Sequence, residues 1–326
     1  MFKALLLEQQ DGVTCSRIAE LDDGALPERD VLVAVAYSSL NYKDGLAITG
    51  KGPIVRQFPM VPGIDLAGTV LSSRDPRFVP GQSVFSTGWS VGEQYWGGMA
   101  QQACLDGDWL QSLPVGLTAR QVMQIGTAGL TAMLCVMALE EGGVSPEQGE
   151  VIVTGASGGV GSLAVSLLAQ LDYKVVAVTG RAENHDYLLA LGACRVLARD
   201  TFATPAKPLE KQLWAGAIDT TGSHLLAHLL AQTRYNGTVA ACGLAAGSDL
   251  PTSVMPFILR NVRLQGVDSV MCPLERRNEA WRRLAELLPA SFYSQACHEV
   301  DLQGAIAAAE AITCGQITGR VLVACQ

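Results

Sequence analysis

The sequence has little charge, few aromatic residues and only four histidines among its 326 residues. Charged residues make up 17% of the chain and the net charge is −8, which argues against the basic face of a nucleic-acid-binding protein. Long apolar runs are also missing. Ala4–Leu7 is shorter than the core of a signal peptide, and Ala128–Leu139 is shorter than a membrane span. We therefore expect a cytoplasmic protein with neither nucleic-acid nor membrane partners.

Paired cysteines are absent as well. The nine cysteines are odd in number and scattered, and no C-x-x-C motif occurs, so a four-cysteine zinc site is excluded and reduced thiols are expected. His224 and His228 have the spacing of two zinc ligands on a helix, but no Glu lies between them and no third ligand is evident. Cys242 is expected to be a small buried apolar residue. The sequence therefore predicts no metal.

A glycine-rich stretch from residue 150 to 181 is the most informative part of the chain. Val151–Val153 reads as a strand, Gly155–Gly161 as a turn, Leu163–Leu171 as a helix and Val175–Val178 as a second strand. This order predicts one crossover unit of a parallel sheet. A glycine turn leading into a helix lets backbone N–H groups approach a pyrophosphate, so the stretch predicts a dinucleotide-binding site.

The glycine motif departs from the standard G-x-G-x-x-G spacing. The three glycine positions of the motif correspond to Ala156, Gly158 and Gly161, so alanine replaces the first glycine, and Gly155 lies one place before it. The strand before it and the helix after it still favour a cofactor site over a purely structural turn. The predicted cofactor-binding residues in the turn are Ala156, Ser157, Gly158, Gly159 and Val160.

The end of the second strand indicates which cofactor is bound. An acidic residue usually holds the ribose 2′-hydroxyl of NAD, whereas a 2′-phosphate favours arginine. The chain has Thr179, Gly180 and Arg181 at this place, and we predict that these three residues bind NADPH through its 2′-phosphate. The alternative is that Arg181 is a solvated loop residue and Glu183 holds the ribose.

The pattern of elements predicts an α/β fold. Residues 1–120 are rich in short β runs, and residues 121–270 alternate helices and strands as in a doubly wound parallel (Rossmann) sheet. Residues 271–326 are expected to return to the first domain. Ligands of such sheets lie at the carboxyl ends of the strands, so Gly243 and Leu244, after an expected strand at 238–242, are also predicted to bind the cofactor.

The whole chain resembles the medium-chain dehydrogenase/reductase superfamily. The resemblance is carried by Ser39–Asp44, Pro62–Gly68, Gly126–Gly129 and Gly155–Gly161. It implies that residues 1–120 form an irregular GroES-like β-barrel domain with catalytic residues. The zinc alcohol dehydrogenases of that superfamily carry Cys, His and Glu where this chain has Asn41, Ile64 and Asp65. The resemblance therefore points to the zinc-free quinone oxidoreductase branch.

Within that branch, Asn41–Gly52, Ala156–Gly161 and Met255–Val270 are similar to the acrylyl-CoA reductase subfamily. This similarity implies NADPH-dependent reduction of acryloyl-CoA, a short enoyl-CoA, to propanoyl-CoA. The family places Asn41 and Tyr42 on a loop near the nicotinamide. Hydride transfer to the β-carbon puts charge on the thioester oxygen, so hydrogen-bond donors are needed there. Asn41 and Tyr42 are the predicted catalytic residues, and Asn41 and Thr127 are predicted cofactor contacts.

Other functions stay open at this level. An NADPH:quinone oxidoreductase needs only an apolar slot for its substrate, and a non-catalytic NADPH sensor needs only the cofactor site. The oligomeric state is undetermined, with a homodimer as one option. A CoA substrate would need basic residues for its phosphates, and the candidates are Lys51, Arg56, Arg260, Arg263, Arg276 and Arg277.

Overall fold

The β-strands form two large sheets in different parts of the chain. The computed structural model describes residues 1–326 and separates two units: Met1–Thr127 with Tyr293–Gln326, and Ala128–Phe292. The chain passes from the first unit to the second within helix α2 (Ala119–Glu141). These boundaries differ from the expected ones, at residues 120 and 270, by several residues at the first and by more than twenty at the second.

The first unit is built mainly from strands. A seven-stranded sheet has the order β14-β15-β3-β4-β5-β7, with β6 also paired to β3, and β1 and β2 form a separate hairpin. Two helices accompany the sheet, α1 (Tyr42–Thr49) and α9 (Leu302–Thr313). The strands are β1 (Phe2–Gln10), β2 (Val13–Leu21), β3 (Val31–Leu40), β4 (Asp65–Ser73), β5 (Ser83–Thr87), β6 (Gln102–Leu105), β7 (Gln111–Ser112), β14 (Cys297–Asp301) and β15 (Arg320–Ala324).

The sequence did not reveal β2 or α1. Most residues of β2 are only partly buried, so the strand has no continuous apolar run to mark it. In α1, Asn41 is the N-cap, and its backbone N–H donates to the carboxylate of Asp44 at 2.9 Å. Asn41 and Tyr42 were expected on a loop. The structure corrects this, because Tyr42 is the first residue of α1.

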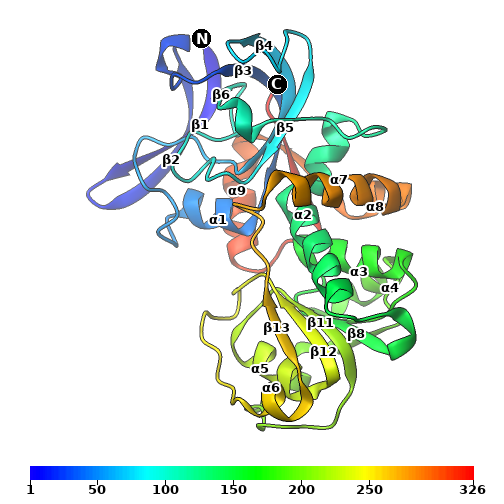
Figure 1. The fold of residues 1–326 in the computed structure, drawn as a ribbon. Helices are drawn as coiled ribbons and strands as arrows, with labels where there is room; N and C mark the ends of the chain where they lie inside the picture. Colours follow the sequence, from blue (N-terminus) through cyan, green and yellow to red (C-terminus); the bar gives the residue numbers. More distant parts are fainter. The chain divides into compact units, whose positions relative to one another are not determined.

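The second unit contains a six-stranded, all-parallel sheet in the order β10-β9-β8-β11-β12-β13. Helices α3 and α4 lie on one face of the sheet and α5 and α6 on the other (Figure 1), the arrangement that right-handed crossovers produce. The predicted doubly wound fold is confirmed. The elements are β8 (Glu150–Val153), α3 (Gly159–Gln170), β9 (Lys174–Thr179), α4 (His185–Ala190), β10 (Arg195–Ala198), β11 (Trp214–Asp219), α5 (Ser223–Gln232), β12 (Thr233–Ala241), α6 (Met255–Arg260) and β13 (Arg263–Gly266).

Helix α7 (Leu274–Leu287) belongs to the second unit, although the segment returning to the first unit was expected to begin at residue 271. Ion pairs from α7 to the end of α2 hold it there: Arg283 lies 2.6 Å from Glu140, and Arg276 pairs with Glu141. Trp281 is buried on the same helix. The return to the first unit begins at Tyr293, within α8 (Ala290–Gln295).

Helix α2 is longer than the apolar stretch recognised in the sequence. By length and composition its 23 residues could cross a membrane, but its most apolar window is entirely buried within the protein. Gly126 interrupts the helix with φ 54° and ψ −161°. The chain therefore passes from one helical segment of α2 to another at this residue.

Candidate functional site

The glycine turn after β8 has the shape of a phosphate-binding turn. Gly155 adopts φ 56°, and a Cβ there would overlap the hydroxyl of Thr220. A Cβ on Gly161 would overlap the carbonyl oxygen of Gly155, so this glycine lets α3 pack closely on the turn. Gly155 therefore makes the tight turn that the standard motif assigns to its first glycine, one position earlier than expected.

The N-terminus of α3 offers unpaired donors. Gly158 is its N-cap without a side-chain cap, and the first N–H groups of a helix have no partner within it. A Cβ on Gly158 would meet only the carbonyl oxygen of Gly155, at 3.3 Å, so the space before the helix is open. The dipole and the N–H groups of Gly159 and Val160 fit a pyrophosphate here. Ala156 is fully buried and its N–H donates to Val178, so it supports the turn.

Three of the predicted cofactor residues lie together at the end of β9. The Ser157 and Thr179 hydroxyls are 3.1 Å apart, and the Arg181 guanidinium donates to the Ser157 hydroxyl at 3.3 Å. The Arg181 backbone N–H also donates to Thr179. The turn and the strand end are thus joined by side chains that suit a phosphate.

A second arginine at this edge was not identified from the sequence. Arg199 begins the short 3-10 helix η5 (Arg199–Phe202) after β10, and a Cβ on Gly180 would lie 3.0 Å from its guanidinium carbon. Strands β9 and β10 are parallel, with Ala198 beside Thr179, so the residues that follow them lie at the same edge. The sequence feature that could have identified Arg199 is its position directly after β10, the strand beside β9. Glu183 is exposed on η4 (Ala182–Asn184).

A cavity of about 280 Å³ opens at the same edge of the sheet. Arg199 lines it together with Ser223 and His224, which begin α5, and with Leu225. The carboxyl ends of β10 and β11 therefore leave room beside Arg199.

A buried carboxylate fixes the point where the strand order reverses. Asp219, at the end of β11, accepts hydrogen bonds from the Thr154 hydroxyl at 2.7 Å, the Thr221 hydroxyl at 2.9 Å and the Gly222 N–H at 2.7 Å. These bonds tie the ends of β8 and β11 to the start of α5. Sequence reasoning missed Asp219, because its position in a strand gave no sign of its partners.

The two residues predicted after β12 differ in their surroundings. A Cβ on Gly243 would overlap the carbonyl oxygen of Thr220, so Gly243 allows close packing of two strand ends. Leu244 is 62% exposed at the same edge. Cys242 is partly buried, and its N–H donates to the carbonyl oxygen of Asp219.

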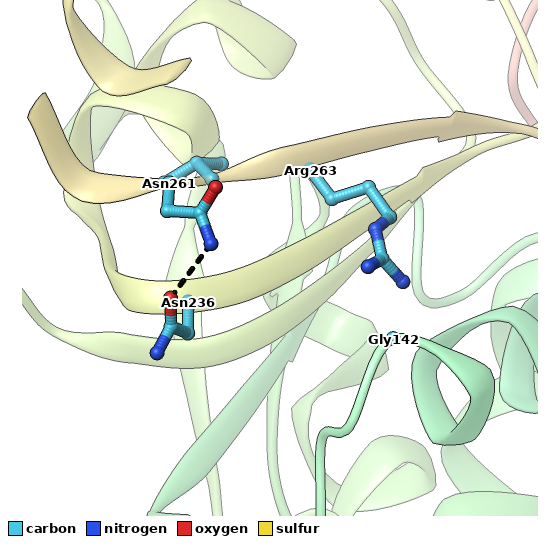
Figure 2. Close-up of a pocket in the computed structure, with 5 residues that line it drawn as sticks. Gly142, Asn236, Asn261 and Arg263 are labelled. Atoms are coloured by element: carbon cyan, nitrogen blue, oxygen red, sulfur yellow. Dashed lines mark hydrogen bonds between the residues drawn. The ribbon is translucent and has the colours of Figure 1, made fainter. Parts of the chain in front are cut away.

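Another cavity, of about 460 Å³, lies at the opposite edge of this sheet (Figure 2). It lies near the amino ends of β12 and β13 and is lined by Gly142, Asn236, Asn261, Val262 and Arg263. Asn261 donates to Asn236 at 2.8 Å, and Arg263 donates to the carbonyl oxygen of Glu141. Because ligands of doubly wound sheets lie at the carboxyl ends of the strands, the topology gives this cavity no part in cofactor binding.

In the first unit, the predicted catalytic residue Asn41 belongs to a buried polar network. Its amide nitrogen donates to Asp65 at 2.9 Å and to Asp44 at 3.2 Å, and its amide oxygen accepts from Arg320 at 3.1 Å. Asp65 also accepts from the Ser39 hydroxyl at 2.6 Å. Both amide hydrogens of Asn41 are thus used within the protein.

Asp44 is buried among donors. It accepts from the N–H groups of Ile64 at 3.0 Å and Gly63 at 3.2 Å in addition to Asn41. Burial, followed by repulsion from Asp65, raises the pKa of Asp44 to about 7, whereas the hydrogen bonds from Asn41 and Ile64 act in the opposite direction.

Tyr42 and Thr127 have opposite environments. Tyr42 is 40% exposed at the start of α1, and its hydroxyl makes no hydrogen bond within the chain, although Lys51 is close enough to interact with it electrostatically. Thr127 is buried, and both its N–H and its hydroxyl donate to Asp65. The network thus contains Asn41 and Thr127, whereas Tyr42 lies beside it with a free hydroxyl.

Most of the basic residues that were candidates for binding CoA phosphates already form ion pairs or hydrogen bonds within the chain. Lys51 pairs with Glu310, Arg276 with Glu141, and Arg260 donates to backbone carbonyls. Arg277 is fully buried. Arg56 is exposed, and its side chain has no ion pair.

The residues at the position of the zinc ligands do not suit a metal. Ile64 has no donor atom, and the two carboxylate oxygens of Asp65 already accept hydrogen bonds from Ser39, Asn41 and Thr127. His228 is buried, with its Nε2 2.6 Å from the carbonyl oxygen of Thr204. The chain contains no group of three or more His, Cys, Asp or Glu side chains arranged to hold a metal ion.

Comparisons with known proteins match both units. A family model described as an alcohol dehydrogenase GroES-like domain matches residues 27–124, and one described as a zinc-binding dehydrogenase matches residues 159–288. Over 321 residues the chain is 65% identical to the probable acrylyl-CoA reductase AcuI of Escherichia coli, covering 98% of this chain and 99% of that protein.

Two further relatives match over nearly the full length. The acrylyl-CoA reductase AcuI of Ruegeria pomeroyi is 49% identical over 326 residues, covering 99% of both chains. A crystal structure of E. coli YhdH with bound NADPH superimposes with a TM-score of 0.98 at 64% identity, covering 99% of this chain and 100% of that one.

Proposed function

The chain belongs to the medium-chain dehydrogenase/reductase superfamily, in the branch of the quinone oxidoreductases and acrylyl-CoA reductases, and we propose that it reduces acryloyl-CoA to propanoyl-CoA with NADPH. The observation that carries the proposal is 65% identity to a probable acrylyl-CoA reductase over almost the entire chain. The turn before α3 and the two arginines beside it support the choice of cofactor.

The residues of the second unit suit NADPH in a defined way. The N–H groups at the start of α3 bind the pyrophosphate, and Arg181 and Arg199 bind the 2′-phosphate with help from the Thr179 and Ser157 hydroxyls. The exposed Leu244, at the same carboxyl edge of the sheet, offers an apolar contact to the cofactor. Bound NADPH supplies a hydride equivalent for the β-carbon of the substrate.

The first unit contains a residue that can donate a hydrogen bond to the thioester of the substrate. Reduction at the β-carbon puts negative charge on the thioester oxygen, and the α-carbon then takes a proton. Tyr42 has a free, exposed hydroxyl and is the donor in this proposal. The side-chain donors of Asn41 and Thr127 are used within the chain, by Asp65 and, for Asn41, also by Asp44, so these two residues act by holding the start of α1 and the break in α2 in place.

Isotope labelling tests the reaction. With NADPH deuterated at the transferred position, acryloyl-CoA should give propanoyl-CoA labelled at the β-carbon. Label at the α-carbon, or no consumption of acryloyl-CoA, would refute the proposal.

Substrate comparison separates this reaction from quinone reduction. If the CoA group positions the enoyl group, acryloyl-CoA should exceed free acrylate by orders of magnitude in kcat/KM, through kcat as well as KM. A quinone oxidoreductase would reduce a simple benzoquinone faster and gain nothing from CoA. An NADPH sensor would turn over neither substrate.

The reaction is proposed to proceed without metal, because Asn41, Ile64 and Asp65 do not make a ligand set. Activity should survive exhaustive treatment with a chelator, with elemental analysis as the second measurement. Stoichiometric zinc that is lost together with activity would contradict this part of the proposal.

Two exposed features of the second unit support a homodimer. Strand β13 is at the edge of the six-stranded sheet, so one side of its backbone is unpaired. Beside it, α6 and the residue before it expose large apolar side chains: Val254 at 65%, Ile258 at 71% and Leu259 at 54%. Pairing of this strand with the same strand of a second copy, covered by the apolar residues, would satisfy both features. Sedimentation velocity measures the state directly.

A further inference from the structure

Arg320 is a buried cation at the centre of the polar network of the first unit. It begins the last strand, β15, and is only 2% exposed. Its Nε donates to the Gln124 carbonyl oxygen at 3.1 Å, one Nη donates to the Asn41 amide oxygen at 3.1 Å, and the other Nη donates to the Ser39 hydroxyl at 2.9 Å. The guanidinium therefore joins β3, the N-cap of α1 and the first part of α2.

The cost of burying this charge argues for a specific role. Burial lowers the pKa of Arg320, although Asp65 and Asp44 oppose that effect. Buried ion pairs seldom add much stability over apolar side chains, but they can enforce one geometry. A guanidinium donates in several fixed directions at once, which a lysine ammonium cannot reproduce.

The geometry that Arg320 enforces is the orientation of Asn41. The amide oxygen of Asn41 faces the Arg320 guanidinium, and its nitrogen faces the carboxylates of Asp65 and Asp44. A flipped amide would place its nitrogen against a cation and its oxygen against two carboxylates. Without Arg320, the amide oxygen of Asn41 would lose its cationic partner, and this side chain would be oriented only through its nitrogen, by the two carboxylates and by longer contacts to Ser39.

The same network holds the break in α2. Asp65 accepts both hydrogen bonds of Thr127, and a Cβ on Gly126 would lie 2.8 Å from an Nη of Arg320. The start of α1, where Tyr42 is exposed, and the break in α2 are thus both connected to Asp65 and Arg320.

We propose that Arg320 is a positioning residue for the reaction: by fixing the Asn41 amide it fixes the first turn of α1 and the direction from which Tyr42 reaches the substrate. This inference rests on the proposed function, in which the Tyr42 hydroxyl donates to the thioester. Arg320 touches neither substrate nor cofactor in this role.

The variant Arg320→Lys keeps the positive charge but loses the planar guanidinium, which donates hydrogen bonds in several fixed directions. We expect kcat with acryloyl-CoA to fall by roughly 10- to 100-fold, the loss of a charge-assisted hydrogen bond, while KM changes by less than about threefold. The Kd of NADPH should stay within about twofold, because the residues proposed to bind it belong to the second unit. Arg320→Met should lower kcat further.

Coupling to Tyr42 separates positioning from general structural damage. Tyr42→Phe should lower kcat in the wild-type background but have little further effect in the Arg320→Lys background, because the hydroxyl is already misplaced there. Hydrogen exchange of the peptide covering residues 41–49 should also speed up in Arg320→Lys. This second readout needs no substrate.

The control Val33→Ala truncates a fully buried residue of the same unit, outside the network. It should lower the melting temperature without changing kcat at assay temperature. Additive effects of Arg320→Lys and Tyr42→Phe, an unchanged kcat, or unchanged hydrogen exchange would overturn the inference. Turnover of acryloyl-CoA by the wild-type protein tests the proposed function separately. A failure of the proposed function can therefore be distinguished from a failure of the positioning role of Arg320.

Discussion

At the scale of single residues, the proposed cofactor preference depends on two arginines from neighbouring strands. Arg181 follows β9 and is the next residue after Gly180. Arg199 follows β10 and lies close to Gly180 in space. A 2′-phosphate carries charge that a free ribose hydroxyl lacks, so two guanidinium groups favour NADPH over NADH. With both present, neither arginine needs to supply the whole preference.

Arg181→Ala and Arg199→Ala should each raise the Kd of NADPH by roughly 10- to 100-fold, the range for a lost hydrogen bond to a charged group. The Kd of NADH should hardly change, and the double variant should lose most of the preference. Fluorescence titration measures both cofactors. The control Glu183→Gln should alter neither Kd, and a weaker NADH affinity in that variant would favour Glu183 as the ribose ligand.

Asp44 makes stability depend on pH in an unusual direction. Its pKa of about 7 in the folded protein compares with an ordinary value of 3.8. The folded state therefore holds this proton more tightly than the unfolded chain, and the stability that the group contributes falls as the pH rises from about 4 to about 7.

The free energy of unfolding should accordingly contain a component from Asp44 that is lower at pH 8 than at pH 4, by at most about 4 kcal/mol. Urea denaturation across this range should show a smaller fall in Asp44→Asn than in the wild type. Asp11→Asn, in the exposed turn between β1 and β2, should keep the wild-type dependence. An identical pH dependence in wild type and Asp44→Asn would contradict the prediction.

At the scale of elements, α2 combines two segments whose junction only glycine can form. Gly126 has a positive φ, and a Cβ there would lie 2.6 Å from a carboxylate oxygen of Asp65 and 2.7 Å from the Ser39 hydroxyl. Backbone conformation and lack of space act together at this residue. The break places Thr127 where its N–H and hydroxyl meet Asp65.

Gly126→Ala should lower the free energy of unfolding by about 3 kcal/mol or more, through backbone strain and displacement of the network. Gly116→Ala is the matched control, since Gly116 also has a positive φ but a Cβ there would meet no atom within 4 Å. It should cost only about 1 kcal/mol. Equal losses in the two variants, measured by urea denaturation, would show that space around Gly126 is unimportant.

For the whole molecule, the proposed homodimer rests on the edge of the parallel sheet in the second unit. The apolar residues on α6 are too exposed to stabilise the unit by themselves, and β13 leaves backbone groups unpaired beside them. An exposed edge with apolar neighbours would be a site of uncontrolled aggregation unless a partner covers it.

Ile258→Asp should shift the protein from dimer to monomer in sedimentation velocity, weakening the dimer by roughly 10- to 100-fold or more, because burial of one such side chain contributes about 1.5–3 kcal/mol. Val115→Asp is the control, since Val115 is 97% exposed in the first unit. A wild-type monomer, or dissociation caused equally by both variants, would contradict an interface at this edge.

The amino-acid sequence alone determined the features that are written in neighbouring residues. The alternation of helices and strands predicted the doubly wound sheet, and the glycines between Val153 and Leu163 predicted the turn into α3. Thr179 and Arg181 could be placed at a strand end because the length of a crossover unit is nearly constant. Each of these inferences needs only local spacing and the known geometry of helices and strands.

The side-chain partners, by contrast, follow from the tertiary structure and could not be predicted from the sequence. Arg199 became a second arginine beside Gly180 through the register of β10 on β9, and Asp219 gained its role through its bonds to Thr154. Arg320 binds Asn41 from 279 residues further along the chain. Such contacts depend on how strands from distant parts of the sequence are ordered in a sheet, and local periodicity carries no information about that order.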